Sequence, residues 1–194
     1  MHVNDPETGI IMFTTEGNIE YICQPDVEIF GDGTFKYCPR YFYQLYTLLG
    51  YKNGHYVPCV FFLLPSKSGE CYTNVFRHLI EVARDIGHNF QLTSIHLDFE
   101  DAVFEAARVF WPTVIIKGCH FHLSQAWWQK IQSLDLATEY KSEESVIRKW
   151  LKVFFGLSFL NSENIEECLH LIYFLTHQMT PVPSDLLTTL CIIT

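Results

Sequence analysis

Two aspartates in this chain stand where metal chemistry could occur. Asp32 follows the apolar stretch 27–30 and lies between two glycines, and Asp98 follows the apolar stretch 92–97. Both carboxylates occupy positions at which a strand pattern calls for Val or Ile, and an unpaired buried carboxylate is costly. Carboxylates at neighbouring strand ends are hard oxygen ligands for Mg²⁺ or Mn²⁺, which activate a water or hydroxyl during phosphoryl transfer. The pattern predicts such a metal site if the two strands are neighbours.

Other interpretations of the reactive side chains stay open. Asp between glycines is common in turns, and acids at the start of a helix interact favourably with its dipole. Cys119, His120 and His122 form a second compact group. A structural zinc site needs four ligands, and no second pair of ligands lies nearby in the sequence. We expect these three side chains to line the cleft beside the carboxylates or simply to pack.

The strands that must position the first aspartate can be predicted from local patterns. Stretch 27–30 is a short strand that should stop at Gly31-Asp32-Gly33, because paired glycines favour a turn. Stretches 43–51 and 56–64 are rich in apolar, β-favouring residues. Asn53-Gly54 lies between them and is the strongest short hairpin signal. We therefore expect three antiparallel strands in succession.

Helical spacing of apolar residues begins after the third strand. The predicted order is a helix over 68–86 ended by Gly87, a strand over 92–97, a helix from Phe99 to Phe110 closed by Pro112, a strand over 113–116 and a helix over 124–134. Three antiparallel strands followed by alternating helices and parallel strands are the order of a ribonuclease-H-like α/β mixed sheet. We expect a lead-in over 1–26, this core over 27–136, a C-terminal helical insertion segment over 137–179 and an irregular, truncated tail over 180–194.

Composition limits the partners and the compartment. The chain has 13 basic and 22 acidic residues, a net charge of -9, whereas phosphate contacts depend on Lys and Arg. Either a basic module outside this chain contacts DNA, or the chain no longer binds it. Seven scattered cysteines without a Cys-x-x-Cys pair favour a reduced compartment, and apolar runs are too short to span a bilayer. We expect a nuclear or cytoplasmic protein with no membrane partner.

Three motifs in the same order resemble the MULE (Mutator-like element) transposase domain of the animal type. They are Phe30-Gly31-Asp32-Gly33-Thr34-Phe35 with the following Asn53-Gly54-His55-Tyr56-Val57-Pro58, then Asp98-Phe99-Glu100, then Lys117-Gly118-Cys119-His120-Phe121-His122-Leu123-Ser124-Gln125. The resemblance runs from about residue 10 to residue 175. Three separate motifs in the right order make it specific.

The resemblance implies a DDE-type enzyme that cleaves DNA and transfers strands with metal. Asp32 and Asp98 would be its first two catalytic and metal-binding acids, and Cys119 with His122 would match a Cys-x-x-His element that shapes the site. The implied cofactor is Mg²⁺ or Mn²⁺. The implied partners are transposon-end DNA, bound weakly by so acidic a fragment, and further copies of the chain in a homo-oligomer.

The third acid of the family is where the sequence departs from the resemblance. A glutamate should follow the helical insertion, but the segment there is Pro183-Ser184-Asp185-Leu186-Leu187. Glu163, Glu166 and Glu167 lie within the insertion as helix-face acids. We therefore expect a transposase-derived domain that is incomplete and inactive as this fragment. The alternatives are a non-catalytic, co-opted interaction module and another ribonuclease-H-like nuclease.

Overall fold

The chain forms two compact units, which are described separately below. The computed structural model describes residues 2–98, 100–160 and 162–179. The first unit ends at Cys119 and the second begins at His120. No helix in these described ranges is both long enough and apolar enough to cross a membrane.

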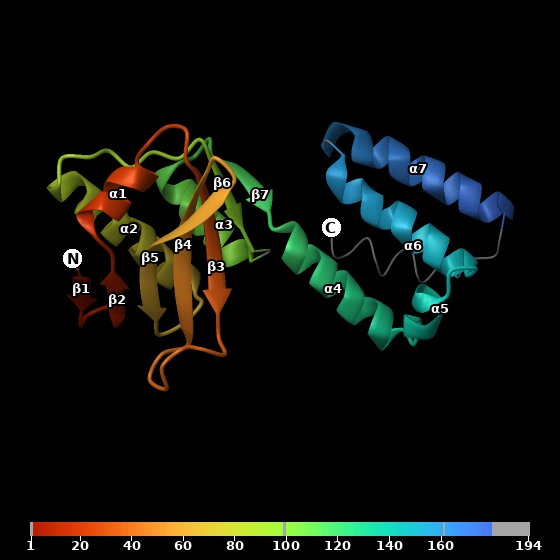
Figure 1. The fold of residues 1–194 in the computed structure, drawn as a ribbon, viewed down its shortest axis with the longest axis horizontal. Helices are drawn as coiled ribbons and strands as arrows, with labels where there is room; N and C mark the ends of the chain where they lie inside the picture. Colours follow the sequence, from red (N-terminus) through yellow and green to blue (C-terminus); the bar gives the residue numbers. More distant parts are fainter. Residues whose placement is uncertain (1, 99, 161, 180–194) are drawn as a thin grey trace. The chain divides into compact units, whose positions relative to one another are not determined.

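The first unit is built on one mixed sheet of seven strands (Figure 1). The strands are β1 (His2–Asp5), β2 (Ile10–Phe13), β3 (Glu28–Thr34), β4 (Gln44–Lys52), β5 (His55–Leu64), β6 (Ser94–Leu97) and β7 (Ile115–Gly118). Their order in the sheet is β1-β2-β5-β4-β3-β6-β7. Strands β3, β4 and β5 pair antiparallel, whereas β6 pairs parallel with both β3 and β7. This is the predicted ribonuclease-H-like α/β arrangement.

The β4–β5 hairpin forms where the sequence predicted it. Asn53 and Gly54 have φ angles of 54° and 82°, the left-handed conformation that a tight hairpin turn requires. The turn sets the register, so that Lys52 lies opposite His55 and Tyr51 opposite Tyr56. The lead-in, to which the sequence analysis assigned no structure, adds β1, β2 and helix α1 (Glu16–Ile22) to this unit.

Three helices bury one set of strand side chains. Helix α2 (Gly69–Asp85) begins after Ser68, whose hydroxyl accepts a hydrogen bond from the Cys71 amide, and Gly87 follows it with a φ of 82°. Helix α3 is Asp101–Phe110. The buried residues of α1, α2 and α3 form one core with alternate residues of the strands, Leu48, Phe62 and Ile95 among them. The intervening strand residues stay at least partly exposed over most of β3, β4 and β6.

Strand β3 corrects the prediction that the chain turns at Gly31-Asp32-Gly33. The strand continues to Thr34, and Asp32 pairs with Thr47 inside it. A Cβ atom on Gly31 would lie 2.8 Å from a Leu97 methyl carbon and closer still to the Tyr46 hydroxyl. A Cβ atom on Gly33 would lie 2.8 Å from the Gln44 side-chain oxygen. The glycines therefore make room for side chains of β4 and β6 and do not end the strand.

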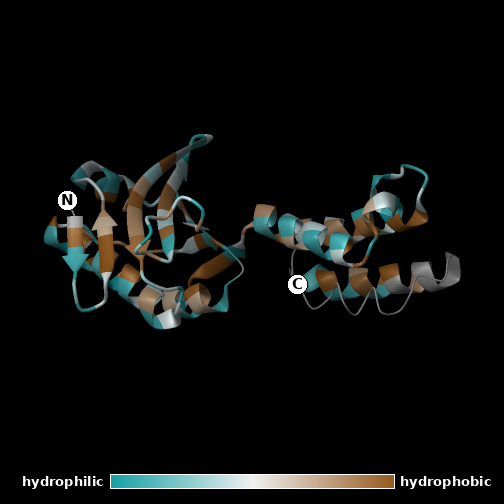
Figure 2. Cartoon of the chain, turned by 90° about the horizontal axis from the view of Figure 1, so that it is seen from below, coloured by the Kyte–Doolittle hydropathy of each residue, from teal (hydrophilic) through white to brown (hydrophobic). Residues whose placement is uncertain are grey.

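The second unit is helical and has a core of its own. Its elements are α4 (His120–Ser133), α5 (Ala137–Lys141), α6 (Val146–Gly156), the short 3-10 helix η1 (Leu157–Phe159) and α7 (Ser162–Met179). Hydrophobic and hydrophilic bands alternate along these helices (Figure 2). The Trp127 ring stacks on Phe155 with centroids 4.5 Å apart, and Trp150 and Leu151 are buried in the same cluster.

The start of α4 differs from the sequence prediction. The helix begins at His120 and not at 124, and it packs with the helices that follow because Trp127 and Ile131 face their core. The compact helical unit therefore includes α4, whereas the predicted insertion starts at 137. The predicted tail, 180–194, lies outside the described residues.

We predict that Gly31→Ala destabilises the first unit. The added methyl group has no space beside Tyr46 and Leu97, and overpacking of this kind costs about 1–3 kcal/mol. Gly17→Ala is the matched control, because no atom lies within 4 Å of the added methyl and alanine favours the helix. Urea unfolding followed by circular dichroism should place only the Gly31 variant at a lower midpoint. Equal midpoints for both variants would contradict this account of β3.

Candidate metal centre

The parallel pairing of β3 with β6 relates the positions of the two predicted aspartates. Ile29 lies opposite Ile95, and Phe30 lies opposite His96. Continuing this register by two residues places Asp32 level with Asp98. Ile95 and Leu97 are fully buried among the helices, so His96 and Asp98 point to the other face of the sheet, as Phe30 and Asp32 do. Neighbouring strands lie about 4.8 Å apart, which is a spacing at which two carboxylates can reach one cation.

Cys119 extends this row of side chains across the next strand. Leu97 lies opposite Gly118 in β7, and the Cys119 amide donates to the Leu97 carbonyl at 2.9 Å. A carboxylate oxygen of Asp98 and the Cys119 sulfur lie within 4.8 Å of each other. His122 is three residues further on, in the first turn of α4, where the second unit begins.

The donor atoms decide which cation this row of residues fits. Two carboxylates match the oxygen ligands that Mg²⁺ and Mn²⁺ take. The Cys119 thiol is a soft ligand that suits zinc better than magnesium. Asp32 and Asp98 are therefore of the ligand type that the expected Mg²⁺ or Mn²⁺ takes, whereas Cys119 is not.

A chain of hydrogen bonds holds Glu100, which lies two residues after Asp98. Gln44 donates to the Tyr72 hydroxyl at 2.8 Å, and that hydroxyl donates to a Glu100 carboxylate oxygen at 2.9 Å. Lys67 pairs with the other Glu100 oxygen at 3.4 Å. Because the Glu100 amide also donates to the Asp98 carbonyl at 2.7 Å, the chain ties the Asp98 segment to α2 and β4.

This role of Glu100 was missed in the sequence analysis. Its place before α3 suggested an interaction with the helix dipole, but its side chain makes no capping hydrogen bond to α3. Gln44 and Tyr72 are separated in sequence by 28 residues, and so are Tyr72 and Glu100. No local pattern signals contacts at that separation.

Tyr46 lies on the helix-covered face of the sheet, on the other side from the face to which the carboxylates point. Its ring packs edge-on against Tyr72 with centroids 5.4 Å apart. Burial raises the pKa of Tyr46 well above its usual range, and the negative charges of Asp98, Glu100 and Asp32 raise that pKa further. Burial also raises the pKa of Tyr72, against the opposing effect of its Gln44 hydrogen bond. Both phenols therefore stay neutral, and Tyr46 senses carboxylates from both strands.

A second charged group, centred on Glu28, lies nearer the start of β3 on the same sheet face. His96 contacts Glu28 at 2.9 Å, and Lys117 of β7 lies 3.7 Å from the same Glu28 oxygen. The Phe30 ring stacks on His96 with centroids 4.0 Å apart. The His96 hydrogen bond, aided by the charge of Lys117, lowers the pKa of Glu28. Lys117, His96 and Phe30 thus form one cluster with Glu28, and nothing in the spacing of these residues predicted it.

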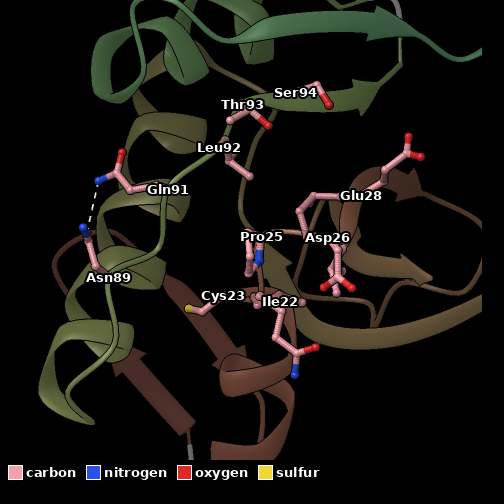
Figure 3. Close-up of a pocket in the computed structure, with 13 residues that line it drawn as sticks. Ile22, Cys23, Pro25, Asp26, Glu28, Asn89, Gln91, Leu92, Thr93 and Ser94 are labelled. Carbon is pink, nitrogen blue, oxygen red and sulfur yellow. Dashed lines mark hydrogen bonds between the residues drawn. The ribbon is translucent and has the colours of Figure 1, made fainter.

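The pocket in Figure 3 is separate from this row of residues. Its volume is about 260 Å³, and it is lined by residues 22–29, Asn89 and residues 91–94. These residues include Glu28 and Ser94, the first residues of β3 and β6, whereas Asp32 and Asp98 lie towards the other ends of those strands. The pocket therefore lies at the opposite end of these two strands from the aspartates.

One family model matches this chain. The family model described as the MULE transposase domain matches residues 29–126, which include Asp32, Asp98, Cys119 and His122. The Drosophila P element transposase strand transfer complex is similar with a TM-score of 0.36 and 12% identity, over 93% of this chain and 52% of that one. The chain thus spans about half the length of that transposase. No curated protein matches.

The two buried tyrosines provide a matched test of the polar chain. Tyr72→Phe removes the hydroxyl that joins Gln44 to Glu100, and leaving buried groups without partners costs about 1–3 kcal/mol. Tyr46→Phe should change stability little, because in the described part of the chain the Tyr46 hydroxyl makes no hydrogen bond. Urea denaturation measures both variants. If Tyr46→Phe costs as much as Tyr72→Phe, the hydrogen-bonded chain does not carry the stability assigned to it.

Proposed function

The chain belongs to the MULE transposase domain family, and on this premise we propose that its first unit binds a divalent cation between Asp32 and Asp98 for DNA cleavage and strand transfer. The observation that supports the proposal is the parallel register of β3 and β6, because continuing it two residues beyond the pair Phe30 and His96 brings Asp32 level with Asp98. The chain is a transposase-derived domain. Its reaction and its cation are what we propose.

In this proposal each residue near the aspartates has a distinct task. Asp32 and Asp98 hold Mg²⁺ or Mn²⁺, which when bound polarises a phosphodiester and activates the attacking water or hydroxyl. Cys119, beside Asp98, and His122 shape the site, as the resemblance implies. Glu100 keeps the Asp98 segment in place through Tyr72, and Lys67 offsets its charge.

Metal binding and strand transfer make different demands on the chain. Two carboxylates suffice to hold a cation, whereas the family reaction uses three acids. Residues 183–190 contain no glutamate, and Glu163, Glu166 and Glu167 lie on α7 in the second unit. We propose that these 194 residues bind the cation without themselves completing the set of three acids. Transposon-end DNA is the substrate of the proposed reaction.

A second candidate function is a non-catalytic interaction module. The observation that favours it is the excess of 22 acidic over 13 basic residues, which opposes phosphate binding. Such a module would keep the fold and lose the dependence of metal binding on the two aspartates. Metal binding therefore distinguishes the two candidates.

We predict that Asp98→Asn weakens Mn²⁺ binding by at least about tenfold, because outer-shell changes alone commonly cost that much. Asp32→Asn should have a similar effect. Asp101→Asn is the control, since it removes the same charge from an exposed position in the first turn of α3. Isothermal titration calorimetry measures the affinities, and circular dichroism verifies the fold.

The same variants connect metal binding to catalysis. Mn²⁺-dependent nicking of DNA, where detected, should fall by orders of magnitude in Asp98→Asn and stay unchanged in Asp101→Asn. Equal Mn²⁺ affinity in all four proteins would refute the proposed metal site and favour the interaction module.

A further inference from the structure

The acidic residues of the chain are distributed very unevenly. All 22 lie outside residues 33–69, whereas that stretch carries Lys36, Arg40, Lys52 and Lys67. A net charge of -9 therefore conceals a region of 37 residues with basic side chains alone. Lys52 and Lys67 pair with Asp26 and Glu100 from other parts of the fold, so Lys36 and Arg40 are the basic residues of this stretch to consider for a polyanion.

The loop between β3 and β4 concentrates exposed aromatic side chains within this region. We call residues 35–43 the aromatic loop. Its exposed fractions are 50% for Phe35, 75% for Tyr37, 89% for Tyr41 and 48% for Tyr43. Single exposed aromatics are ordinary on protein surfaces, but a group of four marks an interaction site.

The rings of the aromatic loop are accompanied by cations. Phe35 and Tyr43 pack edge-on with centroids 5.5 Å apart, and the Lys36 ammonium lies 5.8 Å from the centre of the Tyr37 ring. Arg40 adds a second cation directly before Tyr41. The loop contains no Leu, Ile, Val or Met. Aromatic rings alternating with basic groups suit the bases and phosphates of an unpaired nucleic acid strand better than an apolar protein surface.

The position of the aromatic loop links it to the aspartates. The loop leaves β3 directly after Thr34, two residues beyond Asp32, and appears in orange beyond the tip of the β3 arrow (Figure 1). Because β6 runs parallel to β3, Asp98 lies at this same end of the sheet. The Tyr43 amide donates to the Leu64 carbonyl at 2.8 Å, so the loop is also fixed at the end of β5, three residues before Lys67.

We propose that the aromatic loop stacks against unpaired bases of the DNA strand whose phosphodiester lies at the aspartates. Tyr37 and Tyr41 supply stacking faces, and Lys36 and Arg40 contact flanking phosphates. This inference rests on the proposed function only for the location of the phosphodiester, because base stacking itself needs neither metal nor cleavage.

The test measures binding of a fluorescein-labelled single-stranded 20-mer to the 194-residue chain by anisotropy, with EDTA present. Tyr37→Ala with Tyr41→Ala should weaken binding about tenfold or more, since stacking is lost at two bases. Tyr37→Phe with Tyr41→Phe should restore it, because phenylalanine keeps the stacking face. Phe159→Ala is the control, as Phe159 is also 75% exposed but lies in the second unit.

Salt dependence separates stacking from charge. Replacing Lys36 and Arg40 by Gln should flatten the plot of log affinity against log salt concentration, whereas the alanine pair should leave its slope unchanged. Because EDTA is present throughout, the measured binding does not depend on a metal site, so failure of the proposed metal site leaves this inference standing. Unchanged binding in the alanine pair, or equally tight binding of blunt duplex, would overturn it. A loop that serves a protein partner would give the first of these results.

Discussion

The register of β3 against β6 is the constraint on which the rest of the first unit depends. Ile29, Ile95 and Leu97 are almost completely buried against the helices, so the hydrophobic core holds this register. A slip of one residue would move Asp98 to the helix-covered face and expose Leu97, because side chains alternate along a strand. Core packing on one face thus fixes the position of the carboxylates on the other, whatever chemistry they perform.

The glycines beside Asp32 connect the packing of the helix-covered sheet face with the position of Asp32 on the other face. Their missing side chains leave room for the Tyr46 hydroxyl and the Gln44 amide, and Gln44 continues through Tyr72 to Glu100. Gly33, which follows Asp32, therefore makes room for Gln44, which belongs to the hydrogen-bonded chain that holds the Asp98 segment. Low dielectric strengthens such buried hydrogen bonds and makes each unmade one costly.

Features set by neighbouring residues could be predicted from the sequence, and features set by distant side chains could not. The Asn53-Gly54 turn and the helix that ends before Gly87 depend on a few consecutive residues, and both form as expected. The prediction that β3 stops at Gly31 was wrong because the reason for the glycine is Tyr46, on another strand. The contact between Glu28 and His96 spans 68 residues and has no local signal. The resemblance names Asp32 and Asp98 from motifs far apart in the chain, whereas the register that relates their strands is a property of the sheet.

Local charge, and not net charge, determines how the surface meets a polyanion. At physiological ionic strength, fields between exposed charges decay over about 8 Å, so carboxylates far from the aromatic loop have little effect on Lys36 and Arg40. The nearest acid along the chain is Asp32 itself. In the proposed complex a bound cation offsets that carboxylate, and the phosphate then meets positive charge on both sides. The acidic composition of the whole chain therefore does not describe the aromatic loop, which carries Lys36 and Arg40 and no carboxylate.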